Sequence, residues 1–275
     1  MRISFLSENK TNNPGICAEH GLSIYIETDE MNILFDAGAS DMFAENAQKM
    51  GIDLRNADFC VISHGHYDHT EGVPYFASLN KDAKIILHCE AYIDTYEIDA
   101  NGRIDPVTTG IRWDEQVRKD LESRIIFTDR ELWLSENIAV SGTIDDIEGS
   151  PMTEYFYEKR GDEYIKDPMN HEQFLAVRTE KGVFVFSGCS HRGVRPVLAH
   201  VKRLFPGEKI AGLAAGMHLY NADSRTRTEI VNEVAELDME MVMPVHCTGI
   251  DAICELKTAL GEKCIVASAG DIYEY

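Results

Sequence analysis

The sequence places three histidines and one aspartate within six residues, in the segment His64-Gly65-His66-Tyr67-Asp68-His69. Burying these polar groups together is costly unless each one finds a partner, because burial removes its hydration. A divalent metal ion would satisfy them, since imidazole nitrogens and carboxylate oxygens are common metal ligands. A solvated turn rich in histidine is the alternative interpretation. The density of the pattern favours a metal site.

The elements that must position this segment are a strand before it and a helix after it. Residues 59–62, Phe-Cys-Val-Ile, form a short apolar run that predicts a buried strand, so the motif lies on a strand-to-helix loop. His64 and His66, two apart on an extended backbone, point the same way and can share one ion. Asp68 and His69 follow the turn and can reach a second ion. The spacing therefore predicts two ions side by side.

The pattern HxHxDH after an apolar strand resembles the signature of the metallo-β-lactamase superfamily. Five segments along the chain resemble one subfamily, the hydrolases grouped with 7,8-dihydropterin-6-methyl-4-(β-D-ribofuranosyl)-aminobenzene-5′-phosphate synthase. These segments are AEHGLS (18–23), SHGHYDHT (63–70), GCSHRG (188–193), GMHL (216–219) and HCTG (246–249). The resemblance implies an α+β fold, a four-layer αββα sandwich with the metals at one edge of its two sheets.

The resemblance also assigns ligands beyond the first motif. His246 matches the late histidine ligand of the superfamily and would join Asp68 and His69 on the second ion. The first ion needs one more ligand beside His64 and His66, and the candidates are His191 and His171. The subfamily segments favour His191.

Three further residues carry open alternatives. Asp36 resembles the first motif of the family, a carboxylate that accepts a hydrogen bond from a metal-bound histidine, although a helix cap is the alternative. Where the superfamily has a metal-bridging Asp in a Gly-Asp pair, this chain has Cys189, which is either a thiolate ligand or a small buried filler. His218 is a candidate to bind a substrate phosphate or protonate the leaving group, or else a structural histidine.

Composition restricts the partners. The 275 residues include 47 acidic and 26 basic side chains, a formal net charge of −21, which disfavours nucleic acid and anionic membranes as partners. We expect a small, anionic substrate, for which the metals supply local positive charge. Seven cysteines without a CxxC pair, and an N-terminus without the apolar core of a signal peptide, predict reduced thiols in the cytoplasm. No apolar run approaches the length of a membrane span.

The order of elements predicts a single domain, 1–275, with two similar halves of about 1–130 and 131–275. Residues 171–188 can be compared with residues 20–29 and the return strand 33–35, since both segments show the pattern of a hairpin with an acidic turn, which suggests this internal similarity. Further strands are expected at 2–6 (as a sheet edge), 84–88 and 265–267, and helices at 41–50, 70–79, 195–204, 224–237 and 250–260. Long irregular connections are expected at 92–124, including a short helix, and at 150–170, where Tyr155, Phe156, Tyr157, Lys159 and Arg160 would hold substrate or form a plain surface loop.

Together these features predict a metal-dependent hydrolase. Two divalent ions, zinc in the first place and manganese or iron as alternatives, would provide a metal-bound hydroxide for attack on a phosphoester or carboxyl-type substrate. Asp68 would be both a ligand and the residue that orients the hydroxide. One rival is a synthase that joins a dihydropterin to a ribofuranosyl-aminobenzene phosphate. The other is a non-catalytic, metal-dependent ligand-binding protein.

Overall fold

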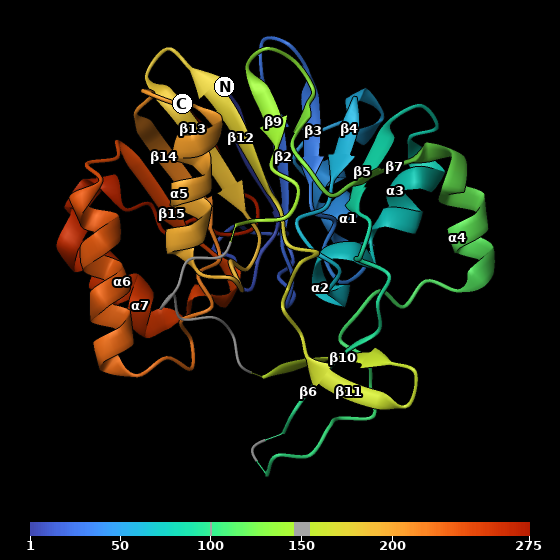
Figure 1. Ribbon diagram of the computed structural model, residues 1–275. Coiled ribbons are helices and arrows are strands. Elements are labelled where there is room, and N and C mark those ends of the chain that lie inside the picture. The colour runs from blue at the N-terminus through green and yellow to red at the C-terminus, as the bar shows by residue number, and fades with distance from the viewer. Residues whose placement is uncertain (100, 146–154) are drawn as a thin grey trace. The chain divides into compact units, whose positions relative to one another are not determined.

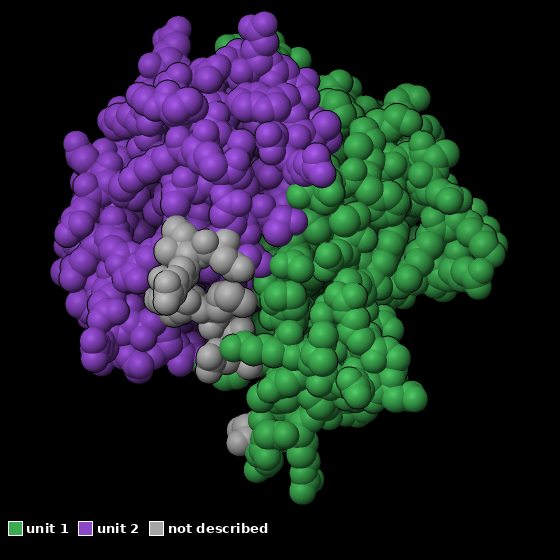
Figure 2. Space-filling model, in the orientation of Figure 1, with its two compact units in different colours: residues 1–129, 154–172, 268–275 green, residues 130–153, 173–267 purple. Residues whose placement is uncertain are grey.

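The computed structural model describes residues 1–99, 101–145 and 155–275, and Figure 1 shows their helices and strands. The chain divides into two compact units, which Figure 2 colours separately. Unit 1 contains Met1–Asp129, Glu154–Glu172 and Ser268–Tyr275, and unit 2 contains Arg130–Thr153 and Gln173–Ala267. The chain thus first leaves unit 1 close to the boundary expected between the two halves, but it later returns to unit 1 twice. The single domain with two similar halves stays a prediction.

The main sheet of unit 1 has seven strands in the order β16-β1-β2-β3-β4-β5-β7. The strands from β16 to β3 pair antiparallel, and those from β3 to β7 pair parallel. Their bounds are Arg2–Ser7 (β1), Ser23–Glu27 (β2), Asn32–Phe35 (β3), Phe59–Val61 (β4), Lys84–His88 (β5), Ile125–Thr128 (β7) and Ile272–Glu274 (β16). The strand predicted to deliver the histidine motif is therefore confirmed as β4.

Helices of unit 1 lie over one face of this sheet (Figure 1). An apolar cluster of buried side chains joins them to its strands. Phe43 and Ala47 of α1 and Phe76 of α3 pack in one buried cluster with Leu34 of β3 and Leu87 of β5. The α-helices span Met42–Lys49 (α1), Tyr67–Thr70 (α2), Val73–Leu79 (α3) and Glu115–Leu121 (α4), and two short 3-10 helices span Leu54–Asn56 (η1) and Glu122–Arg124 (η2). The predicted helix 70–79 is interrupted, because α2 ends before Gly72 and α3 begins after it.

Unit 1 also contains a small antiparallel sheet in the order β11-β10-β6. Its strands span Thr95–Glu97 (β6), Phe156–Arg160 (β10) and Glu163–Lys166 (β11). The expectation that both long connections are irregular was thus wrong where they pair with each other. Residues 150–154 of the second connection lie outside the described residues. Neither segment shows strong apolar alternation, so only pairing between distant segments reveals these strands.

The sheet of unit 2 has six strands in the order β15-β14-β13-β12-β9-β8. Strands β13, β14 and β15 are parallel, and the others pair antiparallel. Their bounds are Leu132–Trp133 (β8), Ile138–Val140 (β9), Phe174–Thr179 (β12), Gly182–Ser187 (β13), Ile210–Ala215 (β14) and Met241–Pro244 (β15). The two predicted hairpins, β2–β3 in unit 1 and β12–β13 in unit 2, are confirmed.

Three helices pack on the unit 2 sheet through a second apolar cluster that includes Val197, Val231 and Leu256 (Figure 1). They span Val194–Leu204 (α5), Ser224–Glu236 (α6) and Ile250–Leu260 (α7), with 3-10 helices at His246–Thr248 (η3) and Gly261–Lys263 (η4). All three match the predicted ranges to within one residue at each end. In the part of the chain that the structure describes, no helix has both the length and the apolar character needed to cross a membrane.

Two expectations near the chain ends were wrong. Strand β1 is not a sheet edge, because β16 pairs with it through Arg2 and Glu274. Residues 265–267 form no strand, and Cys264 makes only an isolated bridge with Val242. The last strand instead adds to the unit 1 sheet, a pairing between opposite ends of the chain that local patterns do not signal.

Gly72 provides a test of the packing between the helices and the sheet of unit 1. A Cβ atom there would lie 2.0 Å from the Ala37 carbonyl oxygen and 2.6 Å from the Phe43 ring. Since the φ angle of Gly72 is −77°, alanine causes no backbone strain, and the expected cost of Gly72→Ala is steric. We expect the free energy of unfolding to fall by about 2 kcal/mol, measured by urea denaturation.

The matched control is Gly51→Ala. Gly51 has a φ of +75° and open space around it, so alanine costs only the left-handed backbone strain, about 1 kcal/mol. A Gly72→Ala protein as stable as the wild type would contradict the close contact at Ala37.

Candidate metal centre

The candidate residues follow the carboxyl ends of parallel strands in each unit. In unit 1, Asp36 follows β3 and His64 follows the neighbouring β4. In unit 2, Cys189 follows β13, His218 follows β14 and His246 follows β15. Ligand sites in sheets commonly form at the carboxyl ends of parallel strands, because these ends meet at one edge. Each unit therefore gathers its own candidate residues.

Unit 1 brings the motif histidines into one buried cluster. The ring centroids of His64 and His66 are 4.6 Å apart, and those of His64 and His69 are 4.2 Å apart. The Asp68 carboxylate lies 3.9 Å from Nε2 of His69. All four side chains are buried, with relative exposures of 6% or less. These are donors that a divalent ion such as zinc accepts.

The buried carboxylate of Asp36 orients two of these histidines. It accepts hydrogen bonds from the Ser63 backbone N–H and hydroxyl, both at 2.7 Å, and from His69 Nδ1 at 2.6 Å. Because the Ser63 hydroxyl gives its only proton to Asp36, its oxygen accepts from His64 Nδ1 at 2.9 Å. Both rings therefore carry a proton on Nδ1, which makes Nε2 the nitrogen available to a metal. Ser63 was not among the residues predicted to shape the site.

Burial and charge act in opposite directions on the cluster. Burial, followed by the neighbouring His171, lowers the pKa of His66 to about 3, so this ring is neutral at pH 7. Burial also acts to lower the pKa of His69, but the charges of Asp36 and Asp68 outweigh it and raise this pKa above its ordinary value. Metal binding requires neutral imidazole, and His66 is already in that form.

His20 also contacts this cluster, a contact that we did not predict from the sequence. Its Nε2 lies 3.2 Å from an Asp68 carboxylate oxygen, and this hydrogen bond raises the pKa of His20. The next residue, Gly21, leaves no room for a side chain, since a Cβ would lie 2.7 Å from the Asp68 carbonyl oxygen. One feature of the sequence pointed to His20: it lies in the segment AEHGLS, one of the five that resemble the subfamily, although that resemblance assigned it no role.

His171, the alternative ligand to His191, uses both ring nitrogens within unit 1. Its Nδ1 accepts a hydrogen bond from the Gly65 backbone N–H at 3.1 Å. Its Nε2 lies 3.4 Å from the Asp167 carboxylate. A metal bond to either nitrogen would displace one of these partners.

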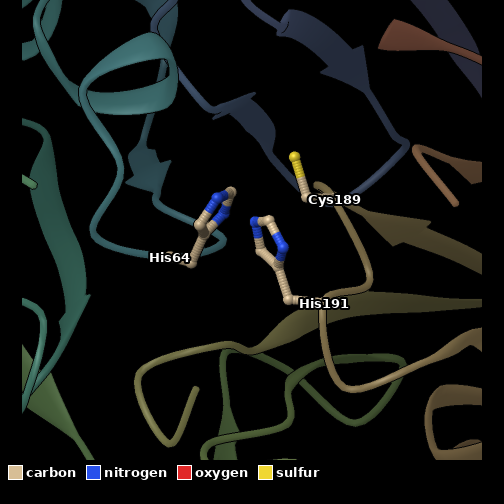
Figure 3. Close-up of side chains that lie close together, drawn as sticks. All are labelled: His64, Cys189 and His191. Atoms are coloured by element: carbon tan, nitrogen blue, oxygen red, sulfur yellow. The ribbon is translucent and has the colours of Figure 1, made fainter. Parts of the chain in front are cut away.

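Unit 2 holds its ligand candidates around one sulfur atom. A ring nitrogen of His191 and one of His246 each lie within 4.8 Å of the Cys189 sulfur. Figure 3 shows Cys189 and His191 on the same segment, and it also labels His64 of unit 1. All three unit 2 side chains are buried. Thiolate and imidazole form a donor pair that suits zinc, so this half also fits a metal.

His218 stands in a row of rings in unit 2. Its centroid is 4.5 Å from that of His191 and 5.1 Å from that of Tyr220. Tyr220 is 49% exposed, whereas His191 is buried. The row therefore runs from a candidate ligand to the surface of the unit.

Backbone strain concentrates at the same positions. Six described residues other than glycine have a positive φ angle, and three of them are site candidates, Asp36 at 58°, His218 at 47° and His246 at 50°. A fourth, Ser190 at 53°, lies between Cys189 and His191. Such conformations cost about 1 kcal/mol or more each and are retained mainly where the surroundings require them, often at functional sites.

Comparisons with known proteins show which family the chain resembles. Residues 18–191 match the family model of the metallo-beta-lactamase superfamily. The uncharacterized protein MJ0448 of Methanocaldococcus jannaschii is 31% identical over 240 residues, which cover 87% of this chain and 88% of that protein. The 7,8-dihydropterin-6-methyl-4-(beta-D-ribofuranosyl)-aminobenzene-5′-phosphate synthase of the same organism is 26% identical over 264 residues, or 92% of this chain and 89% of that protein.

A solved structure extends the comparison to the fold. Tm1679, described as a metal-dependent hydrolase of the beta-lactamase superfamily, has a TM-score of 0.85 and 31% identity, with coverage of 100% of this chain and 99% of that one. The predicted α+β fold class of the metallo-β-lactamase type is thereby confirmed. The family match over residues 18–191 and the 31% identity to Tm1679 show that the chain belongs to the metallo-β-lactamase superfamily.

Proposed function

We propose that this protein is a metal-dependent hydrolase. The observation that carries the proposal is the buried cluster of His64, His66, Asp68 and His69. Hydrogen bonds from the Nδ1 atoms of His64, through Ser63, and of His69 to Asp36 leave Nε2 of both rings available to a metal, which supports this proposal. The similarity to Tm1679, described as a metal-dependent hydrolase, supports the same class of activity.

The proposed ligands come from two donor sets, namely the motif residues of unit 1 and the unit 2 residues Cys189, His191 and His246. His64, His66 and His191 would hold a first ion, and Asp68, His69 and His246 a second. His191 is preferred to His171, because both nitrogens of His171 already have hydrogen-bond partners. Cys189 is the proposed additional ligand, since its sulfur lies close to ring nitrogens of both His191 and His246. Zinc is the proposed metal, because thiolate, imidazole and carboxylate together match its preferences.

Divalent ions bound there would supply Lewis acidity, which lowers the pKa of water toward neutrality and stabilises negative charge on the reacting group. The chain's own residues would do the positioning. Asp36 and Ser63 hold protons on the Nδ1 atoms of His69 and His64, and Asp68 provides an oxygen that can orient the attacking water. His218 would bind an anionic group of the substrate or donate a proton to the leaving group.

The proposed substrate is a small, anionic phosphoester or carboxyl-type molecule. The net charge of −21 opposes the long-range approach of nucleic acid or an anionic membrane, so specific attraction has to arise locally at the metals. The similarity over 92% of the chain to the pterin-linked synthase supports a second candidate, a transferase that joins a dihydropterin to a ribofuranosyl-aminobenzene phosphate.

The decisive experiment combines elemental analysis with a substrate screen. We expect the full chain to bind zinc, manganese or iron and to hydrolyse at least one of a phosphodiester, a phosphomonoester, a lactone and a thioester. Chelation should reduce hydrolysis to background, and adding the metal back should restore it. His66→Ala in unit 1 and His246→Ala in unit 2 should each lose metal, whereas His200→Ala, a buried histidine outside both donor sets, should not.

Each rival predicts a different result. The synthase predicts no turnover of simple esters and product only when both partners are supplied. A non-catalytic binding protein predicts ligand binding that survives Asp68→Ala. A protein that stays free of metal after reconstitution with all three ions would end the hydrolase proposal.

Two substitutions of Asp36 distinguish its effect on metal affinity from its effect on folding stability. Asp36→Ala leaves three buried donors without their acceptor, so we expect a loss of about 3 kcal/mol in unfolding free energy. Asp36→Asn tolerates the positive φ but turns an amide toward His69 Nδ1, which favours moving the ring proton to the ligand nitrogen. It should weaken zinc binding by about tenfold to a hundredfold with less effect on stability. Chelator competition and urea denaturation measure both; unchanged zinc affinity in Asp36→Asn would contradict this role.

Cobalt substitution tests Cys189 as a ligand. If the thiolate binds the metal, the Co²⁺-loaded protein should show a sulfur-to-cobalt charge-transfer band that disappears in Cys189→Ser. Cys247→Ser is the matched control, because Cys247 is also buried and its sulfur contacts the Cys189 carbonyl oxygen at 3.6 Å. The same band in wild type and in Cys189→Ser would show that Cys189 is not a ligand but a small buried side chain that only fills space.

A further inference from the structure

Gly65, between the two motif histidines, is enclosed on two sides within unit 1. A Cβ atom at this position would lie 2.4 Å from the Ala91 carbonyl oxygen, so only glycine fits. On the other side its backbone N–H donates to Nδ1 of His171, 106 residues further along the chain. The backbone between His64 and His66 is thus held by groups outside the motif.

The hydrogen bonds of His171 define its tautomer. A backbone N–H can only donate, so Nδ1 of His171 is the acceptor and carries no proton. The proton of the neutral ring is then on Nε2, which faces the Asp167 carboxylate at 3.4 Å. Asp167 and the Gly65 N–H therefore select the same tautomer from opposite sides of the ring.

The segment that carries His171 is fixed in turn. Asp167 accepts a hydrogen bond from the Met169 backbone N–H at 2.6 Å, and its own N–H donates to the Phe156 carbonyl oxygen at 3.0 Å. Met169 has a φ of 54°, which turns the chain between Asp167 and His171. The Phe156 ring packs on the His66 ring, with centroids 4.6 Å apart.

His171 also lies against both motif histidines. Its centroid is 6.2 Å from that of His64, with the rings nearly parallel at 14°, and 5.7 Å from that of His66. His171 is 3% exposed and Asp167 is 1% exposed. One buried ring therefore contacts each of two neighbouring ligand candidates and bonds to the backbone between them.

We propose that His171 is a positioning residue, held by Asp167, that sets the separation of His64 and His66 by accepting the Gly65 N–H, and that it is not itself a metal ligand. The inference rests on the proposed metal site but adds the role of the 156–171 segment as its support. Displacing Gly65 would move both adjacent histidines at once, so the effect should appear in metal binding.

Two substitutions of His171 distinguish the loss of its hydrogen-bond acceptor from the loss of its side-chain volume. His171→Leu keeps the bulk and removes the acceptor, whereas His171→Asn places an amide oxygen where it can take the Gly65 N–H. We expect His171→Leu to weaken zinc binding by about tenfold and to change the visible spectrum of the Co²⁺-loaded protein. His171→Asn should restore most of the affinity and the wild-type spectrum.

His200→Leu is the matched control, since His200 is a buried histidine of unit 2 that contacts Phe174 and Arg203. It should lower the thermal midpoint without changing zinc affinity. Wild-type affinity and spectrum in His171→Leu would overturn the positioning role while leaving the proposed function standing. A wild-type protein that binds no metal would instead overturn the proposed function, and this inference with it.

A measurement on the wild-type protein needs no variant to fold. With ¹⁵N-labelled histidine and bound ¹¹³Cd, His64 and His66 should show cadmium–nitrogen coupling. His171 should show no coupling and should keep its proton on Nε2 with and without metal. Coupling at either His171 nitrogen would make it a ligand and overturn the proposal.

Discussion

The candidate site depends on one buried carboxylate. Asp36 is fully enclosed and accepts three hydrogen bonds, two from Ser63 and one from His69. A carboxylate in that position requires donors on every side, and those donors fix the tautomers of two histidines. The backbone at Asp36 is held at a φ of 58°, so the surrounding structure must stabilise a conformation that the residue alone would avoid. Placement of the imidazoles thus follows from satisfying a single buried charge.

Parallel strands explain why each unit gathers polar residues at one edge of its sheet. In each unit a hairpin is followed by parallel strands whose carboxyl ends carry the polar residues. Close packing between neighbouring loops then fixes their geometry. In unit 2, a Cβ at Gly216 would lie 2.3 Å from the Gly188 carbonyl oxygen and 2.7 Å from the Cys247 sulfur. Loops held this closely can keep His218 and His246 in strained conformations.

Residues 155–172 form further contacts that stabilise the motif loop of unit 1. It adds two strands to β6, places the Phe156 ring against His66 and brings His171 to Gly65. We predicted this region as an irregular connection that would either hold substrate or form a plain surface loop. Its backbone forms strands instead of an irregular loop, because a short hairpin is stable where β6 offers a partner.

The strand that delivers the histidine motif and the helices of unit 2 could be predicted from the amino-acid sequence, because they depend on local apolar periodicity. The fold class followed from the resemblance of several motifs to one family. Three contacts could not be predicted in this way: the pairing of β16 with β1, the contact of His20 with Asp68, and the hydrogen-bond partners of both His171 nitrogens. Each of these contacts joins residues far apart in the chain. Local patterns record which side chains are apolar or polar, but a hydrogen-bond partner is chosen by the packing of whole elements, which no short window of sequence contains.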